Sequence, residues 1–343
     1  MTDSSSSSLR RIVLASRPQG APTDDNFRVE DVPLPEPREG EMRLRTRYLS
    51  LDPYMRWRMN DGASYADPVA IGGVMVGGTV SEVEVSRHPK FTSGDLVLGF
   101  TGWQSHAISD GTGLNRLDRA MQNPSWALGV LGMPGFTAYY GLLQIGVPKP
   151  GETVVVGAAT GGVGAVVGQI AKIKGCRAVG IAGGAKKCEH AVRDLGFDAC
   201  VDHQAPDFHE QLAAACPQGI DVYFENVGGA VLDAVMPLLN VRARIPLCGL
   251  IAWYDMTSGH LPGPDRSAAL LSRLLVKQIR IQGFVIIDYY ESHYGAFLKD
   301  MSQWLTQGSV RFTEDVIRGL DRAPQAFMGL LRGDNFGKVV VEV

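Results

Sequence analysis

The sequence predicts an α/β fold with two parts: a parallel sheet covered on both faces by helices, and a separate domain of mostly β structure. After Gly151, short β-branched runs alternate with segments of helical apolar spacing, as in parallel strands joined by helices. A glycine-rich turn joins the first strand of that series to its first helix. Between residues 11 and 126, short extended runs are separated by turn residues, which indicates a β domain.

The 343 residues suffice for about two domains of ordinary size. We expect a flexible tail at residues 1–10. Strands are predicted at residues 42–49, 74–85 and 95–100. The stretch 32–40 contains three prolines and is predicted to be a surface loop.

The second part is predicted to alternate strand and helix, with β-branched runs marking strands and helical apolar spacing marking helices. The expected order is strand 153–157, helix 163–174, strand 176–181, helix 187–195, strand 199–201, helix 208–215, strand 220–224, helix 231–239 and strand 243–247. A helix at 268–277, a β-rich run at 279–287, a helix at 290–306 and a β segment at 336–343 follow.

Composition and charge argue against several classes of function. With 33 Lys and Arg against 36 Asp and Glu, the sequence has no basic excess for binding nucleic acid or anionic lipid. Its apolar runs end well short of the roughly 18 residues that a membrane span needs, and its start lacks a secretory apolar core. The five cysteines include no C-x-x-C pair, which favours thiols in a reducing compartment. We therefore expect a cytoplasmic protein that binds neither nucleic acid nor membrane.

The turn at residues 158–164 reads AATGGVG and leads from the first strand of the second part into its first helix. Small residues at Ala159, Gly161 and Gly164 match the spacing of a dinucleotide-binding turn, with alanine in the first glycine place. They keep the turn tight and let the backbone approach a pyrophosphate, toward which the first helical N–H groups point. A tight turn without a ligand would explain this motif alone. The neighbouring strand, helix and two further βα units favour a dinucleotide site.

The residues after the second strand favour NADP(H) over NAD(H). An NAD site places an Asp or Glu about 20 residues beyond the glycine turn, where it accepts a hydrogen bond from the ribose 2′-OH. This sequence instead has Gly183 and Gly184 followed by Lys186 and Lys187. Cations are unfavourable at a helix N-terminus unless an anion joins them, so we expect a 2′-phosphate there. The alternative is that both lysines only solvate the helix end.

The sequence predicts no zinc site. A zinc alcohol dehydrogenase needs Cys and His ligands from its first domain, often with a four-cysteine structural site. The first cysteine is Cys176, and the histidines before it, His88 and His106, are isolated. We therefore expect a reaction without a metal Lewis acid.

Several motifs in combination resemble one branch of a known family. They are LSLDPYMR at residues 49–56, the turn at 158–164, GQIAKIKGC at 168–176, YFENVGG at 223–229 and CGLIAWY at 248–254. They resemble the zinc-independent medium-chain dehydrogenase/reductases that include leukotriene 12-hydroxydehydrogenase/prostaglandin reductase, plant alkenal double-bond reductases and bacterial curcumin reductase. The resemblance covers nearly the whole chain after the serine-rich tail.

The resemblance implies a Rossmann doubly wound parallel sheet inserted in a GroES-like, mostly β catalytic domain. The GroES-like domain would comprise residues 11–127, completed by 310–343, and the Rossmann domain residues 128–309. The resemblance also implies a homodimer and NADPH-dependent reduction of the carbon–carbon double bond of α,β-unsaturated ketones or aldehydes, of the curcumin or 15-oxoprostaglandin type. The alternatives are an NADPH:quinone oxidoreductase and an NADPH-binding protein with little turnover.

Carried over by motif, the resemblance implies cofactor contacts along the second half of the chain, with Lys187 at the 2′-phosphate. The residues concerned are Gly161, Gly162, Val163, Gly164, Lys187, His203, Asn226, Cys248, Gly249, Leu250, Ile251, Ala252, Trp253, Tyr254, Phe284, Val285, Ile286 and Asn335.

Two residues depart from the family pattern. His203 stands where relatives commonly have Tyr near the adenosine phosphate, so its contribution would depend on pH. Trp57 stands where Gly is common, beside the expected active-site entrance, and would affect the size and shape of the substrate.

Tyr254 and Tyr54 are the candidate catalytic residues. Hydride delivery to the β-carbon of an enone leaves an enolate, so hydrogen-bond donors must face the developing oxyanion. A phenol has an ordinary pKa of about 10 and is protonated at neutral pH. Tyr254 ends the CGLIAWY motif and Tyr54 lies in the β domain; either would otherwise be an ordinary packed tyrosine.

Overall fold

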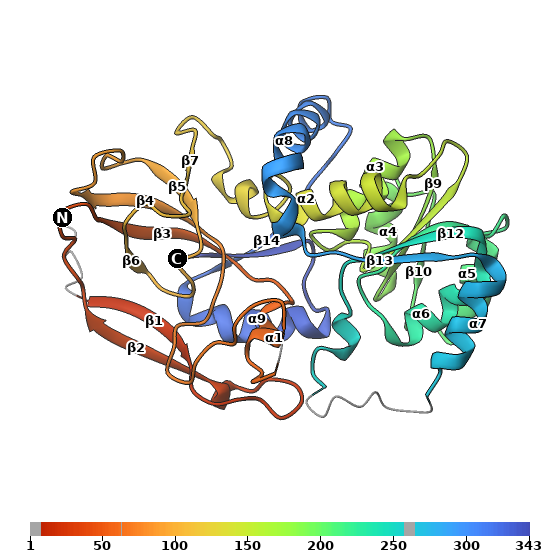
Figure 1. The fold of residues 1–343 in the computed structure, drawn as a ribbon, viewed down its shortest axis with the longest axis horizontal. Coiled ribbons are helices and arrows are strands. Elements are labelled where there is room, and N and C mark those ends of the chain that lie inside the picture. The colour runs from red at the N-terminus through yellow and green to blue at the C-terminus, as the bar shows by residue number, and fades with distance from the viewer. Residues whose placement is uncertain (1–7, 63, 257–264) are drawn as a thin grey trace. The chain divides into compact units, whose positions relative to one another are not determined.

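The structure is a computed structural model that describes residues 8–62, 64–256 and 265–343, and its chain divides into two compact units (Figure 1). The first unit consists of Met1–Gly129, Glu314–Asn335 and Val339–Val343, and the second of Val130–Thr313 and Phe336–Lys338. Residues 310–313 and 336–338, expected in the first domain, thus belong to the second unit. The N–H of Lys338 donates to the Thr313 carbonyl, and the Phe336 ring lies 4.6 Å from the His190 imidazole of that unit.

The first unit is built mainly from antiparallel strands. Its larger sheet has the order β14-β15-β3-β4-β5-β7, and β6 also pairs with β3. These strands are β3 (Met42–Ser50), β4 (Thr79–Ser86), β5 (Leu96–Gly99), β6 (His106–Ser109), β7 (Asn115–Leu117), β14 (Glu314–Arg318) and β15 (Lys338–Glu342). The unit also contains the pair β1 (Ser8–Leu14) and β2 (Phe27–Pro33), with helices α1 (Met55–Arg58) and α9 (Ala323–Arg332).

Aromatic packing holds the C-terminal helix α9 in the first unit. Trp103 is fully buried, stacks on Phe27 of β2 with 5.7 Å between ring centroids, and meets the edge of Phe327 of α9 at 5.6 Å. Buried aromatic side chains each remove a large apolar area from water. This cluster therefore joins segments that are more than 200 residues apart in the sequence.

The second unit is a six-stranded parallel sheet with the order β10-β9-β8-β11-β12-β13. Its strands are β8 (Thr153–Gly157), β9 (Arg177–Ala182), β10 (Ala199–Asp202), β11 (Ile220–Phe224), β12 (Leu239–Leu247) and β13 (Arg280–Gly283). The first strand lies in the middle, and the direction in which strands are added reverses between β8 and β11. This is the doubly wound order of a Rossmann fold.

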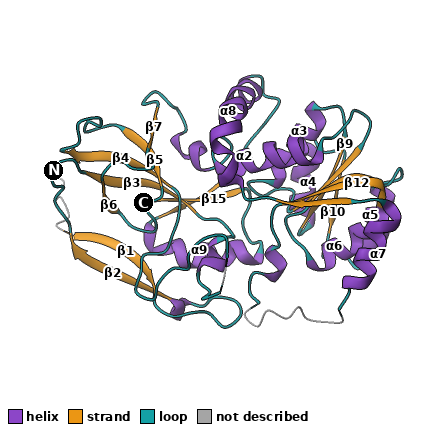
Figure 2. Cartoon of the chain, in the orientation of Figure 1, coloured by secondary structure: helices purple, strands orange, loops and turns teal. Residues whose placement is uncertain are grey.

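Helices cover both faces of this sheet (Figure 2). They are α2 (Met133–Tyr140), α3 (Gly164–Ile173), α4 (Ala185–Arg193), α5 (Phe208–Ala215), α6 (Gly229–Val235), α7 (Ser267–Lys277) and α8 (Tyr290–Thr306). Leu212 of α5 and Val235 of α6 pack with Val155 and Val179 of the sheet in one buried cluster. No helix in the described ranges has both the length and the apolar character needed to cross a membrane.

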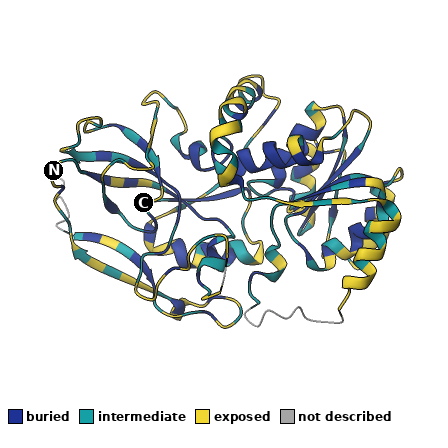
Figure 3. Cartoon of the chain, viewed as in Figure 1, coloured by how far each residue is buried: buried dark blue, intermediate teal, exposed yellow. Residues whose placement is uncertain are grey.

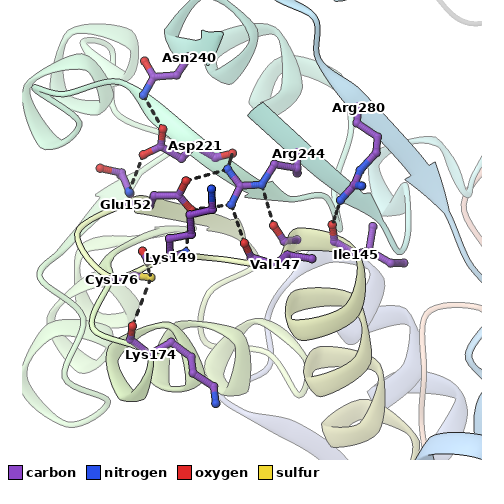
Figure 4. A network of polar contacts seen from close by, with 12 residues as sticks. Ile145, Val147, Lys149, Glu152, Lys174, Cys176, Asp221, Asn240, Arg244 and Arg280 are labelled. Carbon is purple, nitrogen blue, oxygen red and sulfur yellow. Dashed lines mark hydrogen bonds and ion pairs between the residues drawn. The ribbon is translucent and has the colours of Figure 1, made fainter. Parts of the chain in front are cut away.

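A polar network joins the amino ends of the parallel strands (Figure 4). The Arg244 guanidinium donates to Glu152, with 3.0 Å between Nη1 and Oε1, and to the carbonyl oxygens of Val147 (2.8 Å) and Asp221 (3.2 Å). The Asn240 amide donates to the Asp221 carboxylate at 2.8 Å. Burial would raise the pKa of Glu152, but the bond from Arg244 holds it below its usual value. The network ties the start of β8 to β11 and β12.

The structure corrects the N-terminal predictions. Residues 8–10, expected in the flexible tail, begin β1, where Leu9 is buried and Arg10 pairs with Asp31 at 2.8 Å; the rest of that tail lies outside the described residues. Val32 and Pro33, expected in a loop, end β2, because Pro33 is the last residue of a ladder opposite Ser8.

Boundaries elsewhere also differ from the predictions. The strand expected at 74–85 begins only at Thr79, because Val74 and Met75 pair with the backbone of β1 instead. The helix expected at 231–239 ends as α6 at Val235, where a short 3-10 turn containing Pro237 leads into β12. The β-rich run at 279–287 is a strand only over Arg280–Gly283, before a second 3-10 turn.

Candidate functional site

The predicted site residues of the second unit follow the carboxyl ends of its parallel strands. Residues 158–164 follow β8, 183–187 follow β9, His203 follows β10, 225–229 follow β11, 248–254 follow β12 and 284–286 follow β13. Since the strands are parallel, these segments lie together where the strands end, which we call the carboxyl edge of the sheet. The opposite ends of the strands form its amino edge. Ligands of doubly wound sheets bind at the carboxyl edge, where the strand order reverses, and here that is between β8 and β11.

The glycine-rich turn is tight for reasons internal to the chain. Ala158 has a φ of 52°, in the left-handed region, and its carbonyl accepts the N–H of Gly161 at 2.9 Å. A Cβ at Gly164 would lie only 2.3 Å from the Ala158 carbonyl oxygen. A Cβ at Gly161 would meet only that oxygen, at 3.3 Å. Gly164 is thus needed for packing of α3 on β8, whereas the backbone at Gly161 is open to a ligand.

Lys338, which was not predicted as a site residue, lies beside the same turn. It is 4% exposed, and its Cδ atom is 2.9 Å from the place that a Cβ at Gly162 would take. A position after the last helix, more than 170 residues from the turn, gives no sequence signal of this proximity.

The turn after β9 is held by a carboxylate of the next strand. Asp202 Oδ1 accepts the N–H groups of Gly184 and Gln204, both at 2.9 Å. Burial would raise the pKa of Asp202, but these two N–H groups hold it below its usual value. Gly184 has a φ of 89° and caps α4. Sequence reasoning missed Asp202, whose role depends on the pairing of β9 with β10.

This turn presents positive and neutral donors. Lys186 is exposed and Lys187 half-buried in the first turn of α4, which contains no acidic residue. The imidazole Nε2 of His203 lies 3.1 Å from the place of a Cβ at Gly183. The structure therefore brings together the start of α4, Gly183 and His203. This set of groups fits a phosphate, which ammonium, imidazole and backbone N–H groups bind by charge-assisted hydrogen bonds.

Glu225 organises the turn after β11. Its Oε1 atom accepts the Tyr223 hydroxyl at 3.0 Å and the N–H groups of Val227 (2.6 Å) and Gly228 (2.9 Å). The side chain is 1% exposed, and burial outweighs these bonds and raises its pKa. The neighbouring Asn226 amide donates to the Gly157 carbonyl at 3.1 Å and so connects this turn to the end of β8. Glu225 is a positioning residue that the sequence alone did not assign.

The CGLIAWY segment packs on that turn. The N–H groups of Cys248 and Gly249 donate to the Glu225 carbonyl at 3.0 and 3.1 Å. A Cβ at Gly228 would lie 3.2 Å from both Leu250 and Trp253, so the small residue permits the close contact. Burial, and to a lesser extent Glu225, raises the pKa of the Cys248 thiol to about 12. Residues 225–229 and 248–254 therefore form one bonded layer at the ends of β11 and β12.

The two candidate tyrosines lie in different units. Tyr254 is 7% exposed, and its hydroxyl accepts the N–H of Leu250 at 3.4 Å. Tyr54 belongs to the first unit, and its buried hydroxyl has no hydrogen-bond partner among the described residues. Burial, and to a lesser extent the charges of Asp52 and Tyr65, raises the pKa of Tyr54 well above the ordinary value. The Tyr54 phenol therefore stays protonated at neutral pH.

Phe284, Val285 and Ile286 follow β13. The Phe284 ring lies 5.9 Å from that of Tyr140, and Ile286 is 9% exposed. Asn335 is the last residue of the middle segment of the first unit, directly before Phe336.

Comparisons with known proteins agree with this arrangement. A family described as the N-terminal domain of oxidoreductases matches residues 10–117, and one described as zinc-binding dehydrogenase matches residues 162–303. NADPH-dependent curcumin reductase of Escherichia coli (strain K12) is 60% identical over 97% of this chain and 96% of its own. Prostaglandin reductase 1 of Rattus norvegicus is 40% identical over 94% and 96%. The chain belongs to the zinc-independent medium-chain dehydrogenase/reductases.

A solved structure supports the same assignment to the medium-chain dehydrogenase/reductases. The crystal structure of CurA in complex with NADPH from Vibrio vulnificus is 60% identical, covers 97% of this chain and 99% of its own, and gives a TM-score of 0.95. The predicted fold class, a Rossmann sheet with a GroES-like β domain, is confirmed. In the described part of this medium-chain dehydrogenase/reductase, no group of three or more His, Cys, Asp or Glu is placed to hold a metal ion.

Proposed function

We propose that this protein is an NADPH-dependent reductase of the carbon–carbon double bond in α,β-unsaturated ketones and aldehydes. The observation that carries the proposal is the turn after β9, where two lysines begin a helix without acidic residues in its first turn. Such a turn suits a 2′-phosphate and not a ribose hydroxyl. The 60% identical relative is a curcumin reductase that uses NADPH, and the 40% identical relative is a prostaglandin reductase.

The residues that would hold NADP(H) are those of the carboxyl edge. We assign Gly161, Gly162, Val163 and Gly164 to the pyrophosphate, Lys187 and His203 to the 2′-phosphate, and Asn226, Cys248, Gly249, Leu250, Ile251, Ala252, Trp253, Tyr254, Phe284, Val285, Ile286 and Asn335 to the remainder of the cofactor. Backbone N–H groups at the start of α3 and cations at the start of α4 support the orientation of this assignment.

When bound, the nicotinamide supplies a hydride to the β-carbon of the substrate. The task of the chain's own residues is to donate a hydrogen bond to the carbonyl oxygen as negative charge develops there. We assign this donation to Tyr254 first and Tyr54 second. The hydroxyl of Tyr254 lies at the CGLIAWY segment, where it accepts the N–H of Leu250, and the phenol of Tyr54 stays protonated because its pKa is raised.

Conservative variants test the tyrosines. We expect Tyr254→Phe to lower kcat by about a hundredfold, the usual contribution of a positioned acid, with little change in the KM for NADPH. Tyr54→Phe is the matched comparison. An unchanged kcat in Tyr254→Phe with a large loss in Tyr54→Phe would transfer the role to Tyr54.

A substrate panel tests the function. Enones, enals, quinones and alcohols are each mixed with the protein and NADPH or NADH, and the loss of reduced-cofactor absorbance is followed. We expect turnover of enones and enals with NADPH. Turnover of quinones alone would support the quinone oxidoreductase instead, and tight NADPH binding without any turnover would support a binding protein.

We also propose a homodimer formed through β13 and α7. β13 is the last strand of its sheet, and Leu271, Leu275 and Val276 of α7 are 63%, 80% and 72% exposed, in a helix that is largely exposed in Figure 3. An open sheet edge beside an apolar helix face is a typical association surface. We expect Leu275→Glu to elute as a monomer in size-exclusion chromatography, and the unchanged protein as a dimer. A monomeric unchanged protein would contradict the proposal.

The state of the cysteines supports a proposal on the cellular compartment. All five cysteines are unpaired, which supports a cytoplasmic, reducing environment.

A further inference from the structure

The CGLIAWY segment folds back on itself through the 3-10 turn Ile251–Trp253, so that its last side chain reaches its beginning. The N–H of Tyr254 donates to the Ile251 carbonyl at 3.2 Å and closes this turn. The Tyr254 hydroxyl accepts the N–H of Leu250 at 3.4 Å. That separation is near the upper limit for a hydrogen bond, so a small displacement of the hydroxyl would break it.

The Tyr254 hydroxyl lies directly beside Gly249. A Cβ at Gly249 would be 2.9 Å from the Tyr254 hydroxyl oxygen and 3.6 Å from the Asn226 carbonyl oxygen. Within 4 Å it would meet no other atom of the described residues apart from its chain neighbours. The φ angle of Gly249 is also outside the left-handed region, so a side chain causes no backbone strain there. The obstacle to a side chain at this position is therefore the Tyr254 hydroxyl, since 3.6 Å is an ordinary contact.

The backbone around Gly249 is held by hydrogen bonds to the neighbouring turn. The N–H of Gly249 donates to the Glu225 carbonyl at 3.1 Å. The N–H of Ile251 donates to the Asn226 carbonyl at 3.3 Å. A methyl group at Gly249 would thus displace the Tyr254 hydroxyl, the far end of a side chain, before it displaced these backbone groups. The distance has to grow from 2.9 Å to an ordinary contact of about 3.4 Å, a shift of about 0.5 Å.

We propose that Gly249 is a positioning residue: its lack of a side chain sets the place of the Tyr254 hydroxyl, and that place sets the rate of double-bond reduction. The second half rests on the proposed function, in which this hydroxyl donates a hydrogen bond to the substrate oxygen. Gly249 then acts on the reaction only through Tyr254. A misplacement of 1 Å at a reacting centre can cost about a hundredfold in rate, so a shift of about 0.5 Å should cost about tenfold.

Amide hydrogen exchange of the whole protein tests the first half. The N–H of Leu250 should exchange about fivefold faster in Gly249→Ala, because it loses the hydrogen bond that the Tyr254 hydroxyl accepts. Tyr254→Phe should accelerate this exchange by the same factor, and the double variant should exchange no faster than either single variant. Gly295→Ala is the matched control, because its Cβ would point into open space on α8, and it should leave the exchange unchanged. Unchanged exchange of Leu250 in Gly249→Ala overturns the first half.

A double-mutant cycle in kcat tests the second half. We expect Gly249→Ala to lower kcat for an enone about tenfold, with little change in the Kd for NADPH. The double variant should have the kcat of Tyr254→Phe, which has no hydroxyl to displace. Gly249 is also assigned to the cofactor, so an equal loss of kcat in both backgrounds would attribute its effect to cofactor contact and overturn this half. An unchanged kcat in Gly249→Ala would overturn it as well.

Failure of the proposal is distinguishable from failure of the proposed function. If the unchanged protein reduces no enone with NADPH, the proposed function fails and the second half with it, whereas the exchange of Leu250 still decides the first half. If enones are reduced and Tyr254→Phe keeps the kcat of the unchanged protein, the role of Tyr254 fails, and the second half is overturned while the proposed function stands.

Discussion

Carboxylates lie at both ends of the strands of the parallel sheet, but they bond to different partners at the two ends. At the amino edge, Glu152 bonds to the Arg244 guanidinium. At the carboxyl edge, Asp202 and Glu225 bond to backbone N–H groups of the turns that follow β9 and β11. The arginine at the amino edge therefore bonds to acceptors of the protein itself. The carboxylates at the carboxyl edge instead fix the conformation of the turns there.

This difference shows how one sheet separates stability from binding. Charged groups that pair with each other inside the chain fix the relative positions of the strands. Such groups have few hydrogen bonds left to offer a ligand. Turns whose shape is fixed by carboxylates that accept backbone N–H groups can present cations to an external anion. Variants at the two edges should therefore have separable effects, on folding at one and on cofactor binding at the other.

The largest expected effect comes from Gly164, a residue that we expect to affect both the stability of the fold and the binding of NADPH. Gly164→Ala places a Cβ 2.3 Å from the Ala158 carbonyl oxygen, so α3 must move away from β8. We expect the free energy of unfolding to fall by about 3 kcal/mol, as in other overpacked sites. Because the turn moves with the helix, NADPH affinity should fall as well. Urea unfolding and fluorescence titration measure the two quantities.

Gly161→Ala is the matched control in the same turn. Its Cβ would be 3.3 Å from the nearest atom outside its chain neighbours, so unfolding should change by less than about 1 kcal/mol. NADPH affinity should still fall, because the added methyl group occupies the approach of the pyrophosphate. Equal loss of stability in both variants would contradict the distinction between the two glycines.

Arg244→Met tests the amino edge. Removal of the guanidinium leaves Glu152 without its cation in a partly buried place, and we expect a loss of about 2 kcal/mol in unfolding free energy. The Kd for NADPH should not change. Arg318→Met is the control, since its ion pair with Glu342 is exposed and should contribute less than about 1 kcal/mol. A large change in the Kd for NADPH in Arg244→Met would contradict the separation of the two edges into one that stabilises the fold and one that binds the cofactor.

The sequence predicts those features that depend on local pattern. The alternation of strand and helix and the glycine-rich turn are visible because each depends on neighbours within a few residues. Asp202 and Glu225 were not assigned, because their partners are backbone groups of turns whose shapes are known only once the strands are paired. Lys338 approaches Gly162 only through the path of the chain after α9, which no local pattern encodes. The ends of helices and strands can depend on a single residue. The apolar spacing predicts a helix as far as residue 239, but α6 ends before Pro237.

The smallest expected effect is also the most direct test of the central claim, that the carboxyl edge is a site for a cofactor with a 2′-phosphate. The measurement is the Kd of Lys187→Ala for NADPH and for NADH, compared with the unchanged protein. Loss of one charge-assisted hydrogen bond should raise the Kd for NADPH about tenfold and leave the Kd for NADH unchanged. Equal increases for both cofactors, or no increase for either, would contradict the account.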